Sequence, residues 1–420
     1  MSRVLYVSQY FVTGDQPGGV RHWRHTHALR DAGHEVSVVT SYVQHKERTV
    51  PEAYRGRRIV REQEDGLDVW RTYATPGYGR DLASRLANYL SFAALATVAG
   101  LRAPRPDVVV ASSPSLPAAA GAALVALVRR ARFVLEVRDL WPESAVAMGL
   151  VRERSAMALV ARALAWLCYR RADRVIALTE GIRDGVAAKG VDPVRIVLIT
   201  NGVDLDGPPA EPAAVPVPDG AFVAMYVGAH GTYSSLETVL AAAELLRDQD
   251  GIRFVLVGGG DRKPALVADA GRRRLANVAF VDPVPKRDVP AWLARANACL
   301  LPYQDRPLFA GALPNKTFDY MGAGRPIVAA VPAGELSRLV ETAGCGLAIP
   351  PEDPRAMADA VLRLSRDEAL AARLGAAGAG FVRSHYDRRV LAERFVAVIE
   401  GLLGAGPGVR WRAKGRHRRR

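Results

Sequence analysis

Residues 3–40 read RVLYVSQYFVTGDQPGGVRHWRHTHALRDAGHEVSVVT, and this stretch decides the fold. It opens with an apolar run at 3–8 and closes with a second apolar run at 35–40. Between the two runs the pattern predicts a helix at 20–32, which ends at Gly33. The order of strand, helix and strand is typical of a βαβ unit, whose two strands lie parallel in one sheet.

The same alternation continues outward from this unit as far as residue 199. Further strands are predicted at 67–73, 107–111, 132–137, 174–178 and 196–199. Further helices are predicted at 81–101, 116–128 and 155–171. A parallel sheet connected by helices in this way is typical of a Rossmann-like α/β domain.

A second α/β pattern follows a proline-rich break. Residues 204–219 hold five prolines and no apolar periodicity, which is a linker composition. Beyond it we predict strands at 222–227, 253–257, 277–281, 298–301 and 326–330. The helices predicted there lie at 236–247, 289–296, 317–322, 353–364, 368–384 and 388–403.

The sequence therefore predicts an α/β protein of two facing, doubly wound Rossmann-like domains with a ligand cleft between them. Ligands of such sheets bind outside the carboxyl ends of the strands. The predicted parts are a first α/β domain at 1–203, a linker at 204–219, a second α/β domain at 220–387, a last helix at 388–404 and a basic disordered tail at 405–420.

The composition is that of a globular protein, with 49% apolar and 24% charged residues in a chain of 420. Cys168, Cys299 and Cys345 lie far apart in apolar stretches, without metal-ligand spacing or a disulfide framework. The most apolar segment, 116–128, is shorter than the roughly 20 residues of a membrane span. Because the chain starts without a secretory signal, we expect a cytoplasmic protein.

Positive charge is concentrated in the first half and at the end of the chain. The net charge is +14. Residues 1–200 hold 28 basic against 19 acidic residues, and residues 405–420 hold seven basic and no acidic ones. We expect an anionic membrane surface as the partner of these regions, because no nucleic-acid-binding module is visible. The alternative for the tail is a solvated segment without a partner.

The most informative motif is GALPNKTFDYMGAGRP at residues 311–326. Pro314 suits the start of a helix, which would place Asn315 and Lys316 at its amino end. Free N–H groups and an ammonium there suit a diphosphate. Asp319, one turn further on, would accept ribose hydroxyls; the alternative is a surface helix with a Lys–Asp pair.

Glycines after two predicted strands offer further contacts to a nucleotide. Gly18 and Gly19 precede the first helix, where they suit an anionic donor or form an ordinary turn. The segment FVLVGGG ends in Gly258 and Gly260, and a base would rest beside it near Val284. Because Lys occupies position 263, a dinucleotide-binding motif for hydride transfer is unsupported.

Ionisable residues follow the predicted strand at 132–137. Asp139 would orient or deprotonate an acceptor hydroxyl, Arg138 would offset phosphate charge, and Glu143 follows in the same loop. The alternative is a salt bridge that fixes this loop. His22 and His25 share a helix face without a carboxylate, so we interpret them as surface or acceptor-site residues and predict no metal site.

In this order several segments resemble family 4 glycosyltransferases, which are retaining enzymes of the GT-B fold. The segments are PGGV (17–20), LRDAGHEVSVVT (29–40), ADRVIALT (172–179), NGVD (201–204) and AGRP (323–326). Two more, VRDLWPES (137–144) and LPNKTFDY (313–320), are similar to the branch of bacterial N-acetylfucosamine transferases of surface-polysaccharide assembly.

The chain departs from that family at five positions. Of the family's two glutamates, the second falls at Asp319 and the first at Gly311. The family's diphosphate-binding Arg and Lys fall near Ala229 and Ser234, and an acceptor-side histidine falls at Arg138. We therefore move the phosphate role to Lys316 and count Gly228 among the nucleotide contacts. Arg306 and His230 are lesser candidates for the phosphate. The resemblance also implies that residues 1–203 bind the acceptor, that residues 220–387 bind the nucleotide sugar, and that the helix at 388–404 crosses back to the first domain.

The resemblance implies retaining transfer of a sugar from a nucleoside-diphosphate sugar, most simply a UDP-sugar, without a metal cofactor. A lipid-diphosphate-linked acceptor at the inner face of the membrane would explain the basic first half. The alternatives are a soluble transferase acting on a small molecule or natural product, a sugar-nucleotide epimerase, and a non-catalytic sugar-nucleotide-binding module.

Overall fold

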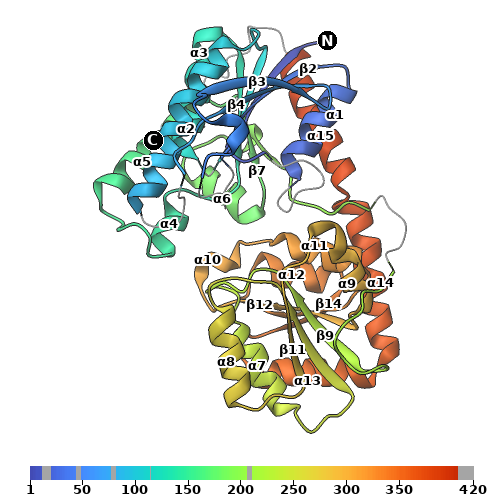
Figure 1. The fold of residues 1–420 in the computed structure, drawn as a ribbon. Helices are drawn as coiled ribbons and strands as arrows, with labels where there is room; N and C mark the ends of the chain where they lie inside the picture. The colour runs from blue at the N-terminus through green and yellow to red at the C-terminus, as the bar shows by residue number, and fades with distance from the viewer. Residues whose placement is uncertain (12–19, 44–48, 77–81, 114, 206–210, 405–420) are drawn as a thin grey trace, which may run out of the picture.

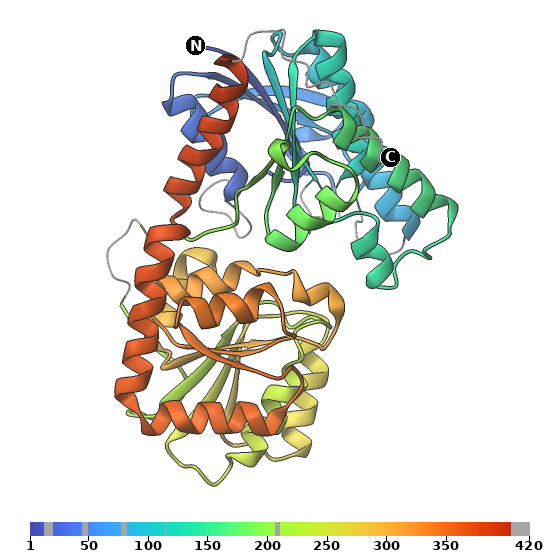
Figure 2. The ribbon, with the colours of Figure 1, turned by 180° about the vertical axis from the view of Figure 1, so that it is seen from behind.

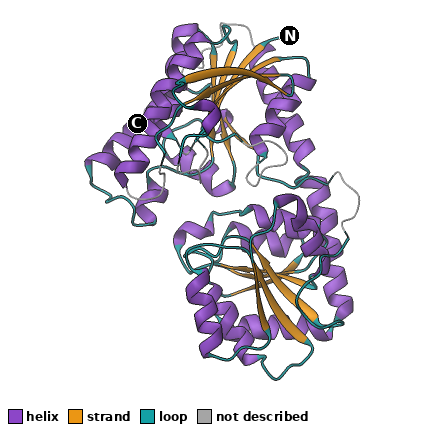
Figure 3. Ribbon diagram, in the orientation of Figure 1, coloured by secondary structure: helices purple, strands orange, loops and turns teal. Residues whose placement is uncertain are grey.

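The computed structural model shows two α/β domains, one above the other in Figure 1. It describes residues 1–11, 20–43, 49–76, 82–113, 115–205 and 211–404. Each domain has its own sheet with helices on both faces (Figure 3). The predicted fold class is confirmed. The basic tail at 405–420 and part of the proline-rich linker lie outside the described residues.

The first domain contains an eight-stranded sheet in the order β3-β4-β2-β1-β5-β6-β7-β8. The strands are β1 (Arg3–Val7), β2 (Glu35–Ser41), β3 (Ile59–Glu64), β4 (Leu67–Thr72), β5 (Val108–Ser112), β6 (Arg132–Val137), β7 (Arg174–Ala177) and β8 (Ile196–Leu198). All neighbours pair in parallel except β3 and β4. Every residue of β5 is buried, as expected of a parallel strand covered on both faces.

Helices cover both faces of this sheet. They are α1 (Arg21–Asp31), α2 (Leu82–Arg102), α3 (Leu116–Arg129), α4 (Glu143–Ala147), α5 (Ala156–Arg171) and α6 (Glu180–Ala188). The helices α2, α3 and α5 share one hydrophobic core with one face of the sheet. On the opposite face, α1 packs together with the last helix of the chain.

The second domain contains a six-stranded, all-parallel sheet in the order β11-β10-β9-β12-β13-β14. Its strands are β9 (Phe222–Val227), β10 (Ile252–Val257), β11 (Val278–Val281), β12 (Ala298–Pro302), β13 (Ile327–Ala330) and β14 (Gly346–Ile349). Its helices are α7 (Leu236–Leu245), α8 (Lys263–Arg272), α9 (Val289–Arg295), α10 (Pro307–Ala310), α11 (Asn315–Gly322), α12 (Glu335–Thr342), α13 (Pro354–Arg366) and α14 (Glu368–His385).

The last helix, α15 (Arg388–Gly404), returns the chain to the first domain (Figure 2). Leu391, Phe395 and Ile399 lie in the core that α1 forms with the first sheet. The ring of Phe395 stacks on His25 with centroids 4.1 Å apart. The helix α15 is therefore part of the packing of the first domain.

The two domains touch at the amino end of α6. The Glu335 carboxylate accepts the backbone N–H groups of Glu180 (2.8 Å) and Gly181 (3.0 Å). The Thr179 hydroxyl donates to the Gly311 carbonyl at 3.0 Å. A Cβ on Gly181 would lie 2.9 Å from the Gly311 Cα, so this contact requires glycine. The interface therefore uses Gly311, the position where the resembled family carries a glutamate.

Several elements were not predicted, namely β3, β14, α4, α6, α8, α10 and α12. The strand β3 reads IVREQE and lies antiparallel at the sheet edge, where four of its six side chains are polar. Its pattern therefore lacks the apolar run of the central strands. No helix of the described residues is long and apolar enough to cross a membrane.

Candidate functional site

A pocket between the two domains brings together predicted site residues from both. It lies after β6 and β8 of the first domain and at the amino end of α11 of the second. Its lining residues are Val20, Arg21, His25, Arg138, Asn201, Gly202, Asn315, Arg388 and Leu391. Among the described residues Arg21 and Arg388 pair with Glu136 and Asp204, so the pocket offers an anion chiefly Arg138 and the two asparagines.

The helix α11 starts at Asn315, two residues earlier than predicted. Pro314 precedes it in extended geometry, and no side chain caps the amino end. The exposed Asn315 lines the interdomain pocket. Backbone N–H groups at an uncapped helix start, together with the positive end of the helix dipole, favour an anionic ligand.

Lys316 places an ammonium beside this helix start. Its Nζ donates to the Tyr226 hydroxyl at 2.7 Å and lies 4.1 Å from the centre of the Tyr226 ring. No carboxylate of the described residues pairs with it. Burial lowers the pKa of Lys316, but Tyr303 and Tyr226 raise it above its usual value, so the charge persists at neutral pH. An uncompensated cation held in this way suits phosphate.

Asp319 lies one turn further along α11 and pairs with Lys286 at 2.6 Å. The predicted alternative was a Lys–Asp pair on the helix, and the observed partner comes instead from the segment after β11. The Asp319 side chain is 15% exposed. Val284, the residue predicted to lie near a base, is half-buried two residues before Lys286.

The loops after β9 and β10 interlock, and this explains their glycines. A Cβ on Gly258 would lie 1.9 Å from the Gly228 carbonyl oxygen, and one on Gly260 would lie 2.6 Å from the His230 carbonyl oxygen. Both glycines also have positive φ, at 146° and 149°. Close loop packing therefore already requires glycine here, whatever nucleotide contact the loops make. At Gly228 a Cβ would lie 2.9 Å from the Lys316 Nζ, so glycine leaves room for that ammonium.

His230 is fully buried, and neither ring nitrogen has a partner within the described part of the chain. Burial, together with the charges of Lys263 and Lys316, lowers its pKa to about 4. The imidazole is therefore neutral at physiological pH and offers no charge to a phosphate. The lesser phosphate role predicted for His230 would therefore depend on a ring N–H donor.

Arg138, after β6, reaches across to the first helix. Its guanidinium donates to His22 Nε2 at 3.1 Å, and His22 Nδ1 bonds to the Tyr6 hydroxyl at 2.8 Å. Burial lowers the pKa of His22 to about 3, so the ring is neutral. A neutral partner leaves the charge of Arg138 directed into the interdomain pocket.

A buried carboxylate, Glu136, organises this side of the site. It lies on β6 and accepts Arg21 Nε at 3.2 Å and the Ser112 hydroxyl at 3.1 Å. Burial alone would raise the pKa of Glu136, but Arg21 and the neighbouring His22 hold it well below its usual value. Arg21 also donates to the backbone carbonyls of Thr200 and Ile199. This cluster therefore fixes α1 against the carboxyl ends of β6 and β8.

The interpretation of His22 and His25 as surface residues without a carboxylate is wrong. Both rings are buried, and their Nδ1 atoms lie 3.8 Å and 3.6 Å from Glu136. The sequence signal for Glu136 was a single acid in the otherwise apolar strand RFVLEV. A lone buried acid in such a strand requires a cationic or hydrogen-bonding partner.

Asp139 and Glu143 differ in their surroundings. Asp139 is accessible to solvent, but protein surrounds its carboxyl on most sides, and this desolvation raises its pKa against the opposing effect of Arg138. Glu143 pairs with Lys189 at 2.6 Å, which fixes α4 to α6. Asp139 therefore remains available to a substrate, whereas Glu143 is engaged in a salt bridge of the loop.

The remaining predicted residues are more peripheral. The exposed Arg306 lies before α10 with its guanidinium 5.9 Å from the centre of the Tyr233 ring. Gly18 and Gly19 lie outside the described residues.

Two family models together match most of the chain. A "Glycosyl transferase 4-like domain" matches residues 18–202, and "Glycosyl transferases group 1" matches residues 221–367. The chain belongs to the GT4-like glycosyltransferases. Relatives include the probable glycosyltransferase WbjE of Pseudomonas aeruginosa, 25% identical over 65% of this chain and 69% of that protein. The putative colanic acid biosynthesis glycosyl transferase WcaI of Escherichia coli K12 is 28% identical over 78% of this chain and 84% of that protein.

Solved structures agree with this assignment in fold. The glycosyltransferase superimposes on sucrose-phosphate synthase from Thermosynechococcus elongatus with a TM-score of 0.73, at 19% identity and covering 97% and 100% of the two chains. It superimposes on Anabaena HepE in complex with UDP with a TM-score of 0.68 at 16% identity. The superposition covers 95% of this chain and 100% of the HepE chain. At these identities the likeness establishes the GT-B fold.

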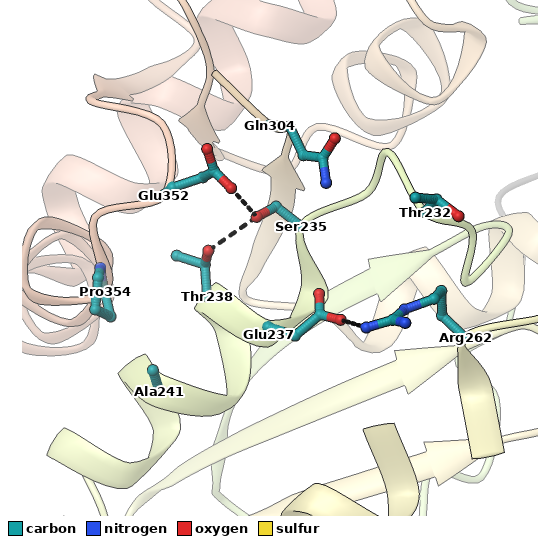
Figure 4. Close-up of a pocket in the computed structure, with 9 residues that line it drawn as sticks. All are labelled: Thr232, Ser235, Glu237, Thr238, Ala241, Arg262, Gln304, Glu352 and Pro354. Atoms are coloured by element: carbon teal, nitrogen blue, oxygen red, sulfur yellow. Dashed lines mark hydrogen bonds and ion pairs between the residues drawn. The ribbon is translucent and has the colours of Figure 1, made fainter. Parts of the chain in front are cut away.

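A second pocket of about 500 Å³ lies in the second domain of this glycosyltransferase (Figure 4). The Ser235 hydroxyl bonds to Thr238 at 3.1 Å and to Glu352 at 3.5 Å, and Arg262 pairs with Glu237. The neighbouring Ser234 points the other way, to the hydroxyl of Tyr226 beneath Lys316. The loop 228–235 therefore separates a cationic side from a pocket rich in hydroxyls and carboxylates.

Over the described ranges of the glycosyltransferase, no three His, Cys, Asp or Glu side chains are grouped so as to hold a metal ion. The acids of the interdomain site instead pair with cations, as Glu136 does with Arg21 and Asp319 with Lys286.

Proposed function

We propose that this glycosyltransferase transfers a sugar from a UDP-sugar to a hydroxyl acceptor, with retention of anomeric configuration, in the assembly of a bacterial surface polysaccharide. WcaI is named for colanic acid biosynthesis, and the HepE structure contains UDP. Both names support the proposal. The observation that carries it is Lys316, a cation without a carboxylate partner beside the uncapped start of α11.

The donor diphosphate would bind between Lys316 and the N–H groups at the start of α11. Asn315 and Arg138 face the same space from the two domains. The ribose hydroxyls would donate to Asp319 alongside Lys286, since the two oxygens of a carboxylate can accept about four hydrogen bonds. The base would then lie toward Val284. The likeness of residues 137–144 and 313–320 to N-acetylfucosamine transferases supports a donor of the N-acetylhexosamine class.

We propose transfer that does not require a metal ion. When the bond to the donor sugar breaks, negative charge develops on the leaving diphosphate. Fixed donors already aimed at that charge stabilise the transition state without reorganising. Lys316, Arg138 and the helix start are such donors. Unchanged turnover after exhaustive chelation supports this part, and a loss restored by added Mg²⁺ contradicts it.

The acceptor would approach from the first domain, where Asp139 is accessible beside Arg138. A carboxylate there suits orientation or deprotonation of an acceptor hydroxyl. Arg138 suits a phosphate on the acceptor, and the basic first half supports a lipid-diphosphate-linked acceptor at the inner face of the membrane.

The test is ligand-induced thermal stabilisation followed by product analysis. We expect UDP and UDP-sugars to raise the melting temperature of the chain more than GDP or CMP does. Lys316→Ala and Asp319→Ala should each reduce the UDP effect, whereas the exposed α8 control Arg272→Ala should leave it unchanged. Equal responses in all variants would remove the proposed donor site. NMR of the product then gives its anomeric configuration.

A further inference from the structure

Exposed apolar side chains gather on three helices of the first domain. Fifteen large apolar side chains of the described residues are exposed, and ten of them lie on α2, α3 and α5. The ten are Leu86, Leu90, Val98, Leu124, Leu127, Val128, Leu159, Val160, Trp166 and Leu167. Exposed fractions reach 60% at Val160 and 56% at Trp166. A concentration of exposed apolar side chains on neighbouring helices is typical of an interaction site.

The three helices form one layer, with α3 packed between α2 and α5 (Figure 1). Their inner sides share the core over one face of the first sheet. On α5 the buried residues Ala165, Cys168 and Tyr169 face this core, while the pairs at 159–160 and 166–167 are exposed. The apolar residues therefore lie on the outer surface of a continuous helical layer, which we name the α2–α3–α5 face.

The charge of these helices has one sign. Their sequences, 82–102, 116–129 and 156–171, contain no aspartate or glutamate, although the whole chain has 43 acidic residues. They contain six arginines, namely Arg85, Arg102, Arg129, Arg162, Arg170 and Arg171. The Arg170 guanidinium lies 5.3 Å from the centre of the Trp166 ring. A surface of this composition is complementary to negative charge.

We propose that the α2–α3–α5 face rests on an anionic lipid bilayer. A helix layer with outward apolar residues and arginines lies in the interface, with apolar groups among the acyl chains and guanidinium groups at the phosphates. Tryptophan favours this depth, and Trp166 is one of the four exposed apolar residues of α5. The contact is peripheral, since no helix of the described ranges can span a membrane.

A protein partner fits the same face less well. The cores of protein interfaces are depleted of charge, and an interface partner would need several acids opposite the arginines. A bilayer with anionic headgroups presents negative charge over its whole surface, so each arginine finds a phosphate without a matched arrangement of acids. Contact with the bilayer would bring the first domain to a lipid-linked acceptor. This role of the α2–α3–α5 face in catalysis rests on the proposed function. Vesicle binding itself needs neither donor nor acceptor.

The test is co-sedimentation of the full chain with vesicles of 70% phosphatidylcholine and 30% phosphatidylglycerol, compared with phosphatidylcholine alone. We expect binding to the anionic vesicles, weakened by salt, and a blue shift of tryptophan emission that Trp166→Phe removes. The double variant Leu159→Gln, Val160→Gln should lower the partition coefficient at least roughly tenfold. The control Leu245→Gln, Val267→Gln, at exposed residues of α7 and α8, should bind as the parent does.

Three results would overturn the proposal: equal binding to neutral vesicles, equal loss in both double variants, or no vesicle binding together with self-association that only the α5 variant abolishes. The last result would assign the face to a second copy of the chain. UDP-induced thermal stabilisation is measured in the same variants. We expect the stabilisation by UDP to be the same in these variants as in the parent. A failure of membrane binding is thereby distinguished from a failure of the donor site.

Discussion

Replacing Lys316 with methionine removes the ammonium and keeps most of the side-chain volume. In the structure the Nζ contacts the Tyr226 hydroxyl and lies near Gly228, without a carboxylate partner among the described residues. Tyr226 keeps its bonds to the Ala229 carbonyl (2.7 Å) and the Ser234 hydroxyl (2.9 Å). The variant should therefore fold with little change in melting temperature.

The expected loss of UDP affinity follows from the charge. An ammonium 4 Å from one phosphate charge interacts by about 4 kcal/mol at an effective dielectric constant of 20, and desolvation offsets part of this. Hydrogen bonds to charged groups contribute about 1.5–3 kcal/mol net. We therefore expect a loss of about 2–3 kcal/mol, which weakens UDP binding roughly 30- to 150-fold.

Isothermal titration calorimetry with UDP and with uridine measures this loss directly. Because uridine has no phosphate, its affinity should change by less than about twofold in Lys316→Met. Arg272→Met, which removes an exposed cation of α8, is the matched control and should bind both ligands as the parent does. Equal UDP affinity in the parent and Lys316→Met, or parallel losses for UDP and uridine, would refute the assignment of the diphosphate to this lysine.

Three further predictions concern the first domain. Glu136→Ala leaves the buried Arg21 guanidinium without its carboxylate and should cost about 3–5 kcal/mol in urea unfolding, whereas the exposed-pair variant Glu35→Ala should cost less than about 1 kcal/mol. Burial lowers the folded-state pKa of His22 to about 3, so between pH 7 and 5 this imidazole takes up a proton in the unfolded chain and stays neutral in the folded one. The free energy of unfolding should therefore fall by about 2 kcal/mol from His22 alone as the pH is lowered from 7 to 5. His22→Gln should show a shallower fall when urea unfolding is measured at both pH values. The low pKa of Glu136 does not oppose this trend, because its stabilisation is lost only below the usual carboxyl range. Asp139→Asn should lower kcat by about 100-fold or more and leave the UDP affinity unchanged. Because burial raises the pKa of Asp139, the rate of the parent should start to fall on acidification at a higher pH than an ordinary aspartate would give. An unchanged kcat in Asp139→Asn would make Asp139 a structural residue.

Most of the fold was predictable because its signals are local. The strand 222–227 is a continuous apolar run, and the strand 132–137 is apolar except for Arg132 and Glu136; the structure places both with the predicted bounds. The start of α11 was predictable from Pro314 within two residues. By contrast, β3 depends on pairing with β4 at a sheet edge, and its own alternation is mostly polar.

The parts of the site that were missed depend on contacts between distant residues. Glu136 is stabilised by Arg21, 115 positions away, so neither residue alone signals the cluster. The contact of Glu335 with the start of α6 joins two domains across 154 positions. The pairing of Asp319 with Lys286 likewise depends on where the segment after β11 turns. Spacing in a sequence carries no information on such partners until the sheets are assembled.

The most direct measurement is a crystal structure of the chain with UDP. We predict the diphosphate between the domains, with a phosphate oxygen about 3 Å from the Lys316 ammonium and another accepting backbone N–H groups at the start of α11. UDP bound instead in the pocket between Ser235 and Glu352, or on an outer surface away from α11, would contradict a donor site built on that lysine.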